Sequence, residues 1–283
     1  MSVIVPTSLH IALRALAVTP EATVLAGGTD LMVELNSGHR PVSSVIAVGR
    51  IPELRSWSHD PVARLLHIGA GITYGEIARE PLAQWVPALA QAARTVGSPQ
   101  IRHAATIGGN LGTCSPAGDG LPVLAALDAV VHLASLEGVR SVPFADYMVG
   151  PKRTARQPGE LITGVTVPVV RGWQGYSKVG VRNAMVIAVA SAALVADLDA
   201  RTVRVALGSV GPTILRCPDA EAFAAEHVDF AAGNMADSVV ERFAALVRAA
   251  ARPIDDHRSS AAYRRHAVGV LGGRLLRRAF PDG

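Results

Sequence analysis

The sequence is poor in the residues that build metal sites, disulfides and aromatic cores. Only 4% of its 283 residues are aromatic, and it contains two cysteines, Cys114 and Cys217. Iron–sulfur clusters and structural zinc usually take four ligands, so two cysteines cannot hold either one alone. Two cysteines also give no disulfide framework, which fits a reducing compartment. We therefore expect a cytoplasmic chain with an aliphatic core and no metal site of its own.

Long apolar segments are missing as well. The N-terminus, Met1–Pro6, lacks a basic region followed by an apolar stretch, so no secretory signal is predicted. The longest apolar run, residues 184–196, is too short to span a bilayer and is closed by Asp197. These absences predict a soluble protein without membrane insertion.

Several activities lack their signatures. The net charge of +4 is mild, and the arginines between Arg258 and Arg278 have one aromatic among them, Tyr263, and belong to no recognised binding module, so a solvated or partner-facing helix side is favoured over nucleic-acid binding. A Walker A lysine is absent, which leaves nucleoside-triphosphate hydrolysis unsupported. Ser115, His103 and Asp119 lie close in sequence, but no G-x-S-x-G elbow accompanies them. No catalytic residue and no metal ligand is predicted.

Two diglycine segments stand out against this background. The first is Ala26-Gly27-Gly28-Thr29-Asp30-Leu31, and the second is Thr106-Ile107-Gly108-Gly109-Asn110. Adjacent glycines expose consecutive N–H groups, and fixed N–H groups bind phosphate oxygens without a mobile cation. Either segment alone is typical of a tight turn. The pair indicates a ligand with a diphosphate.

The surroundings of the first diglycine strengthen this interpretation. Residues 23–26 read as a short buried strand, and Thr29 or Asp30 can cap a helix over residues 31–35, which is the geometry for an anion at a helix N-terminus. Residues 65–76 also read as a strand, a G-x-G turn and a helix. There the third glycine comes one residue late and no acid follows to hold a ribose, so we predict a structural turn.

The two halves of the chain differ in pattern. Residues 130–134 and 139–142 predict a hairpin, and the exposed segment 151–159 indicates a nearby domain boundary. Beyond it, three β-type segments predict an antiparallel meander, followed by three helices. The segments are 161–167, 188–197 and 203–208, and the helices are 219–226, 235–250 and 259–280. A small sheet followed by helices indicates a second, α+β domain.

These segments together resemble the FAD-binding (medium) subunit of the molybdenum hydroxylases, the xanthine dehydrogenase and carbon monoxide dehydrogenase family. Both diglycine segments are similar to that family's FAD loops, and Ser115-Pro116-Ala117-Gly118-Asp119 resembles the segment whose acid meets the flavin nucleotide. Lys178 stands where such proteins carry a flavin-contacting lysine, and Ile162 matches an apolar flavin contact. The closing pattern Ala262–Leu276 is similar to the family's last helix.

The resemblance implies a cofactor site, a fold and partners. The implied FAD contacts are Leu25, Ala26, Gly27, Gly28, Thr29, Asp30, Leu31, Thr106, Ile107, Gly108, Gly109, Asn110, Ser115, Asp119, Ile162 and Lys178. The implied fold is α+β. A two-lobed FAD-binding domain of the PCMH type (1–170, lobes of about 1–55 and 56–170) precedes an antiparallel sheet with a helical bundle (171–283). The implied partners are a [2Fe–2S] small subunit and a molybdopterin-binding large subunit, arranged as a dimer of heterotrimers.

The function implied is that of a flavoprotein electron-transfer subunit, which passes electrons from the partner's clusters through FAD to an external acceptor. The absence of an acid/base set agrees with this role, because the flavin carries the chemistry. Two alternatives stay open. One is a free-standing FAD oxidoreductase, and the other is a scaffold subunit that has lost the cofactor.

Overall fold

The computed structural model describes residues 2–38 and 42–281, which form a mixed helix and sheet fold, as predicted. The strands are β1 (Ser2–Ile4), β2 (Thr23–Leu25), β3 (Ser44–Ala47), β4 (Trp57–Asp60), β5 (Leu65–Gly69), β6 (Val130–Ser135), β7 (Gly138–Pro143), β8 (Met148–Gly150), β9 (Arg153–Thr154), β10 (Leu161–Pro168), β11 (Gly172–Val179), β12 (Ala190–Asp197), β13 (Thr202–Gly208) and β14 (Leu215–Arg216). The α-helices are α1 (Leu9–Val18), α2 (Leu31–Asn36), α3 (Tyr74–Ile77), α4 (Leu82–Trp85), α5 (Pro87–Thr95), α6 (Pro99–Ala104), α7 (Ile107–Thr113), α8 (Gly120–Ala126), α9 (Phe144–Tyr147), α10 (Pro218–His227), α11 (Asp237–Ala250) and α12 (Ala261–Ala279). Two short 3-10 helices, η1 (Val48–Arg50) and η2 (Pro52–Arg55), follow β3.

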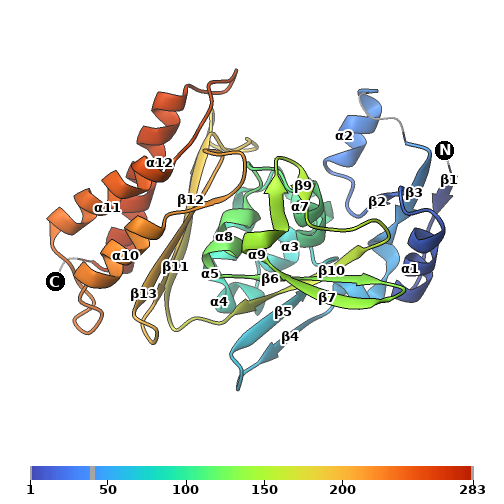
Figure 1. Ribbon diagram of the computed structural model, residues 1–283, viewed down its shortest axis with the longest axis horizontal. Coiled ribbons are helices and arrows are strands. Elements are labelled where there is room, and N and C mark those ends of the chain that lie inside the picture. The colour runs from blue at the N-terminus through green and yellow to red at the C-terminus, as the bar shows by residue number, and fades with distance from the viewer. Residues whose placement is uncertain (1, 39–41, 282–283) are drawn as a thin grey trace.

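The N-terminal lobe is a small parallel sheet with one covering helix. Its strand order is β1-β3-β2, and α1 packs on it through Ala12, Leu13 and Leu16. The Ser8 side chain accepts a hydrogen bond from the Ile11 N–H and so caps the start of α1. Strand β2 ends at the first diglycine, so this lobe presents that loop at its edge (Figure 1).

The second lobe is a five-stranded antiparallel sheet with order β4-β5-β10-β6-β7. The predicted hairpin is confirmed by β6 and β7. The predicted turn after β5 is also confirmed, because Thr73 and Glu76 form a capping box that starts α3. The placement of residues 161–167 in the meander was wrong. They form β10, which pairs with β5 and β6 in this lobe, because their alternating pattern does not specify which sheet they join.

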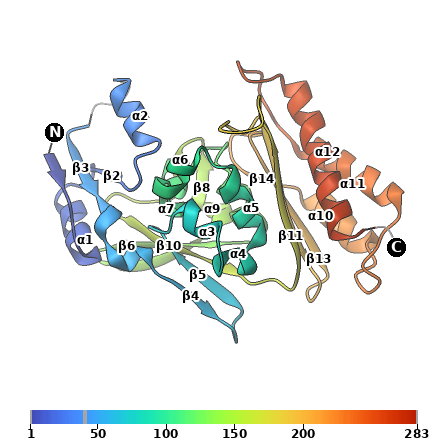
Figure 2. The ribbon, with the colours of Figure 1, turned by 180° about the vertical axis from the view of Figure 1, so that it is seen from behind.

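The C-terminal part is a four-stranded antiparallel sheet, β11-β12-β13-β14, with helices on its outer face. Strand β11 was missing from the prediction, and it takes the position in the meander that had been given to β10. The helices α10, α11 and α12 agree with the three predicted segments. Figures 1 and 2 show them on one side of this sheet, with α4, α5 and α8 on the other.

The core consists of three clusters of buried side chains, one for each of these parts. The middle cluster includes Tyr176, Ala193 and Ala206 from the C-terminal sheet, so one face of that sheet packs against the second lobe. Its other face packs against α10–α12. A domain boundary near residue 170 stays a proposal, and the two parts around it share a continuous core.

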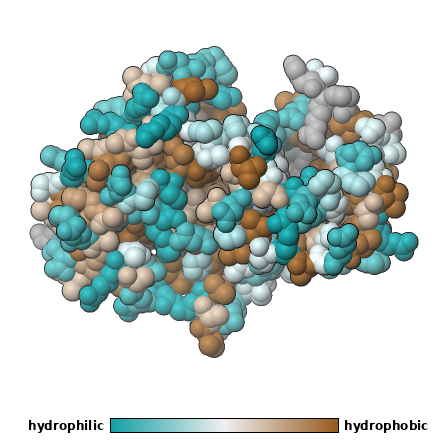
Figure 3. Space-filling view, viewed as in Figure 1, coloured by the Kyte–Doolittle hydropathy of each residue, from teal (hydrophilic) through white to brown (hydrophobic). Residues whose placement is uncertain are grey.

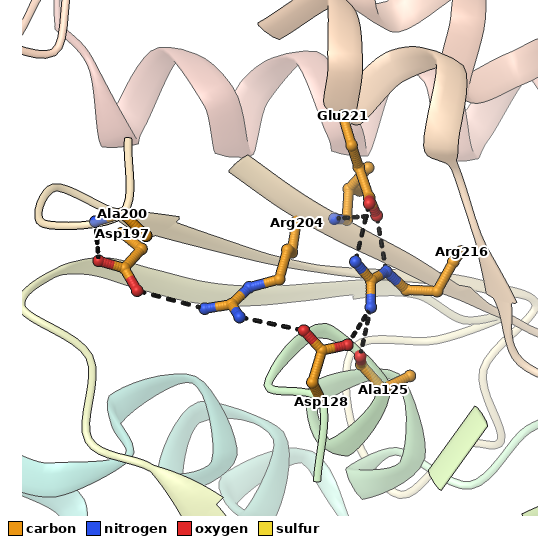
Figure 4. Close-up of polar contacts among 8 residues, drawn as sticks. Ala125, Asp128, Asp197, Ala200, Arg204, Arg216 and Glu221 are labelled. Carbon is orange, nitrogen blue, oxygen red and sulfur yellow. Dashed lines mark hydrogen bonds and ion pairs between the residues drawn. The ribbon is translucent and has the colours of Figure 1, made fainter. Parts of the chain in front are cut away.

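A chain of ion pairs also joins the two parts (Figure 4). Asp128, in the turn before β6, pairs with both Arg204 of β13 and Arg216 of β14. Arg216 continues to Glu221 of α10, with Nε–Oε1 at 2.6 Å. The two arginine side chains are 17% and 30% exposed, which makes this network less screened than an ordinary surface pair.

We expect Asp128→Asn to weaken the junction between the two parts. Asparagine tolerates the backbone at this position, where φ is 49°, so the change removes charge without straining the turn. We expect a loss of about 1–2 kcal/mol in the free energy of unfolding, because two partly buried arginines lose their shared carboxylate. Urea titration followed by circular dichroism measures it.

Asp199→Asn is the matched control. Asp199 also pairs with two arginines, Arg64 and Arg171, but those side chains are 46% and 71% exposed. A smaller loss is expected there. Equal losses in the two variants would show that the partly buried position of Arg204 and Arg216 adds nothing to their pairs with Asp128.

Candidate functional site

A cavity of about 910 Å³ lies between the two lobes of the N-terminal half. Its wall is formed by residues within 20–34, 48–55, 70–74, 96–119, 152–162 and 185–187. Figure 3 shows the surface hollowed at its upper edge, between the α2 side of the molecule and the C-terminal part. Only the fold brings these six segments together, because the first of them ends at residue 34 and the last begins at residue 185.

The first diglycine forms one wall of the cavity. Gly28 has φ of +70°, a conformation that favours glycine. Gly27 approaches α6 so closely that a Cβ there would lie 1.7 Å from the Ala104 carbonyl oxygen. Among the described residues, the N–H groups of Gly27, Gly28 and Thr29 donate no hydrogen bond to a backbone or side-chain acceptor. Consecutive N–H groups without partners are suited to an anion.

The predicted cap of α2 takes a different form. Asp30 occupies the N-cap position of α2, but its side chain makes no capping hydrogen bond. Its Oδ2 instead accepts from the Thr113 hydroxyl of α7 at 3.2 Å. Lys152 Nζ lies 2.5 Å from Glu34 Oε1 of α2. These two contacts join the lobes at the edge of the cavity.

The second diglycine is not a loop but the first turn of α7. Thr106 is the N-cap, and its Oγ1 accepts from Gly109 N at 3.0 Å. The Gly108 N–H donates to the Ala70 carbonyl at 2.9 Å. The N–H groups of these two glycines are therefore already paired, which corrects the expectation that they offer free donors to a diphosphate. Gly108 instead allows close packing, since a Cβ there would lie 2.5 Å from the Ala70 Cβ.

Asp119 and Lys178 form a buried ion pair, with Oδ2 and Nζ 2.7 Å apart and side chains 10% and 9% exposed. Lys178 also donates to the carbonyl oxygens of Thr95 and Val186, and Asp119 Oδ1 accepts from the Tyr176 hydroxyl at 2.7 Å. Burial raises the pKa of Asp119, and the charge of Lys178 opposes part of that rise. The pair crosses from α8 to β11 and so joins the site to the C-terminal sheet.

The cavity wall contains fourteen of the sixteen predicted contacts. They are Leu25, Ala26, Gly27, Gly28, Thr29, Asp30, Leu31, Thr106, Gly108, Gly109, Asn110, Ser115, Asp119 and Ile162. Ile107 is fully buried in the hydrophobic core and does not line the cavity. Lys178 lies behind Asp119, outside the wall. Contact of these residues with a cofactor stays a proposal.

The same wall contains residues that the sequence did not indicate. Tyr74 is the first residue of α3, Arg55 ends η2, His103 lies in α6, and the apolar residues Val186 and Ile187 come from the loop after β11. None of them belongs to a recognisable motif. Tyr74 follows a capping residue, which signals a helix start and not a ligand.

Glu160 is a carboxylate of the cavity wall that is held by several hydrogen bonds. Both of its carboxylate oxygens accept from Arg140, at 2.5 and 2.9 Å, and Oε2 also accepts from the Gln157 N–H. The Arg140 guanidinium holds the pKa of Glu160 below its usual value of 4.5. The segment that leads into β10 is anchored by this carboxylate.

This shift gives a stability effect with a defined sign. Below about pH 4.5 the unfolded chain binds a proton at this glutamate that the folded chain does not, so stability falls as pH falls through the lower folded pKa. We expect the melting temperature of Glu160→Gln to fall less steeply than that of the parent chain as the pH is lowered. Thermal melts between pH 3 and 7 measure it, with Glu137→Gln in the exposed hairpin turn as the charge-removal control. An equally steep fall in Glu160→Gln would contradict this assignment.

Other kinds of site find little support among the described residues. No group of three or more His, Cys, Asp or Glu side chains within residues 2–38 and 42–281 could hold a metal ion. Ser115 Oγ accepts a hydrogen bond from the Ala117 N–H, and Asp119 accepts hydrogen bonds from Lys178 and Tyr176. These contacts give no support to a catalytic triad of Ser115, His103 and Asp119. No helix in the described ranges has both the length and the hydrophobicity needed to cross a membrane.

Comparison with known proteins gives matches over almost the whole chain. The family described as FAD binding domain in molybdopterin dehydrogenase matches residues 1–170, and the CO dehydrogenase flavoprotein C-terminal domain matches residues 176–279. The chain is 33% identical over 270 residues to the glyceraldehyde dehydrogenase medium chain of Sulfolobus acidocaldarius, covering 93% of this chain and 92% of the relative. It is 29% identical to the carbon monoxide dehydrogenase medium chain of Hydrogenophaga pseudoflava, covering 92% and 90%.

Solved structures give the same result. A carbon monoxide dehydrogenase structure from Hydrogenophaga pseudoflava matches with a TM-score of 0.90 and 28% identity, covering 99% of this chain and 96% of the other. Quinoline 2-oxidoreductase from Pseudomonas putida 86 matches with a TM-score of 0.89 and 25% identity over the same shares. The likeness includes both lobes and the C-terminal sheet with its helices.

Proposed function

Because the chain belongs to the FAD-binding (medium) subunits of the molybdenum hydroxylase family, the xanthine dehydrogenase and carbon monoxide dehydrogenase type, we propose that it relays electrons. They would come from the [2Fe–2S] clusters of a partner subunit, pass through FAD on this chain and leave to an external acceptor. A molybdopterin-binding large subunit would oxidise the substrate. The complex would be a dimer of heterotrimers in the cytoplasm.

The observation that carries the site is the set of unpaired N–H groups of Gly27, Gly28 and Thr29 in the wall of the cavity. They fit the diphosphate of FAD, which needs fixed donors. Ile162 and the loop residues Val186 and Ile187 are apolar members of the same wall, and apolar side chains suit the flat ring of a flavin. The residues present therefore suit FAD at both its charged and its apolar parts.

Each group of residues has its own task in this proposal. The first loop binds the diphosphate, Asn110 and Asp119 hold hydroxyl groups of the cofactor, and Lys178 pairs with the buried Asp119 and favours its ionised form. The FAD, when bound, accepts and passes on the electrons, so the chain needs no general acid or base of its own. Binding, orientation and exclusion of water are what these side chains supply.

Substrate choice belongs to another chain in this proposal. The relatives are named for different substrates, among them glyceraldehyde, nicotinate and carbon monoxide. One FAD-binding fold serves all of them, which is expected if the substrate never touches this subunit. The word "medium chain" or "subunit" in these names also favours a multisubunit complex over a free-standing oxidoreductase.

Stopped-flow absorption of the assembled complex tests the relay. After the substrate is added without an acceptor, the cluster absorption should fall first and the flavin absorption should follow. A complex stripped of FAD should still bleach its clusters but should not reduce the external acceptor. Acceptor reduction at the full rate without FAD would contradict the relay.

A further inference from the structure

Two buried tyrosines from different parts of the chain donate hydrogen bonds to the two polar side chains that we place against the cofactor. Tyr74 of α3 is 2% exposed, and its hydroxyl donates to Asn110 Oδ1 at 2.6 Å. Tyr176 of β11 is 5% exposed, and its hydroxyl donates to Asp119 Oδ1 at 2.7 Å. Asn110 and Asp119 both line the cavity. Each tyrosine thus lies behind one cavity side chain.

Both phenols are permanent donors. Burial raises the pKa of Tyr74 far above its usual value, and the charge of Asp119 raises it further. The pKa of Tyr176 is raised for the same two reasons, burial and Asp119. A protonated hydroxyl that is held within 2.7 Å of an acceptor fixes which atom of that partner it meets.

The consequence differs for the two partners. Because Tyr74 occupies the oxygen of the Asn110 amide, the Nδ2 group with its two N–H donors is the end left for other contacts. Asp119 can only accept when ionised, and Tyr176 and Lys178 each use one of its oxygens while leaving further lone pairs. The site therefore presents one donor and one acceptor in fixed places.

The surrounding backbone is shaped around these tyrosines. A Cβ at position 120 would lie 2.4 Å from the Tyr74 hydroxyl oxygen, so Gly120 makes room for it. The N–H of Tyr176 donates to Gln91 Oε1 at 2.8 Å, which anchors this part of β11 to α5.

We propose that Tyr74 and Tyr176 are positioning residues that set the hydrogen-bond polarity of the FAD site, with Asn110 as its donor and Asp119 as its acceptor. This proposal rests on the placement of FAD against these two side chains. A cofactor hydroxyl can accept from Asn110 and donate to Asp119. Without the tyrosine hydroxyl, the side chain of Asn110 or Asp119 is free to rotate, and its hydrogen bond to the cofactor hydroxyl weakens. Neither tyrosine needs to touch the cofactor for this effect.

The test uses the FAD-depleted full-length chain and FAD titration, with Tyr74→Phe, Tyr176→Phe, Asn110→Ala and the double variant Tyr74→Phe/Asn110→Ala. Tyr147→Phe is the matched control, because Tyr147 is equally buried and its hydroxyl contacts the Leu111 carbonyl and the Thr154 side chain, neither of which we place against the cofactor. The visible circular dichroism of bound flavin is the second readout, since a purely structural loss of stability would not change its band shape.

We expect Tyr74→Phe and Tyr176→Phe each to raise the Kd for FAD about tenfold and to alter the flavin dichroism, whereas Tyr147→Phe changes neither. The double variant should bind FAD no more weakly than Asn110→Ala alone, because Tyr74 acts through Asn110. If Asn110→Ala weakens FAD but Tyr74→Phe and Tyr176→Phe behave like Tyr147→Phe, the positioning role is overturned. If Asn110→Ala leaves FAD affinity unchanged, the placement of FAD is overturned together with it.

Discussion

Replacement of Gly27 by alanine is expected to abolish FAD binding and to destabilise the N-terminal half. The new Cβ would lie 1.7 Å from the Ala104 carbonyl oxygen and 3.1 Å from the Ala105 nitrogen. Both are backbone atoms, so no side-chain rotation can relieve the overlap, and the first loop must move away from α6. We expect an affinity loss of more than about 100-fold and a loss of roughly 2–3 kcal/mol in unfolding free energy.

Gly109→Ala separates the two effects. A Cβ at Gly109 would meet only the Thr106 Oγ1, at 3.2 Å, so α7 can accommodate it with a small shift. We expect stability close to that of the parent chain but weaker FAD binding, because Gly109 lines the cavity. Isothermal titration with FAD and urea unfolding measure both quantities. Tight FAD binding by Gly27→Ala would contradict the geometry of the first loop.

Lys178→Met is expected to cause the second large effect. It leaves the Asp119 carboxylate buried without its ion-pair partner and removes the donor to the Thr95 and Val186 carbonyls. Breaking a buried pair from one side costs about 3–5 kcal/mol, because the remaining charge stays desolvated. We therefore expect a large fall in the melting temperature and loss of flavin from the purified chain.

The double variant Asp119→Leu/Lys178→Met identifies the cause. Removing both charges replaces the pair by apolar groups, so much of the lost stability should return. FAD binding should not return, because Asp119 itself lines the cavity. The loss of unfolding free energy in the double variant is compared with the sum of the losses in Lys178→Met and Asp119→Leu. If the two are equal, the destabilisation does not come from an unpaired buried charge. Retention of full stability and flavin by Lys178→Met would contradict the role given to the pair.

The sequence identified the loops of the site better than their chemistry. Diglycines are visible in a sequence because only glycine permits such close approach, and both segments lie in the cavity wall. Whether their N–H groups are free depends on Ala70 and Thr106, which the fold brings into contact with α7. The pattern of residues could not reveal that the N–H groups of the first segment stay unpaired while those of Gly108 and Gly109 form hydrogen bonds within the protein.

The same limit applies to the residues that act across the fold. Lys178 is expected beside the flavin, and its place outside the cavity wall, paired with Asp119, depends on how β11 and the start of α8 meet in the fold. Tyr74 was missed because it is about 36 residues from Asn110 and belongs to no motif. The assignment of residues 161–167 to the wrong sheet has a similar origin, because strand periodicity defines the faces of a strand but not its neighbours.

The most direct test of the central claim is the amount and identity of flavin bound by the purified full-length chain. The protein should show flavin absorption in the visible range, and heat denaturation should release FAD at one molecule per chain. Depleted chain should regain this spectrum with added FAD, while Gly27→Ala should not. A chain that is colourless as purified and stays colourless after FAD is added would contradict FAD binding in this cavity, and with it the electron relay.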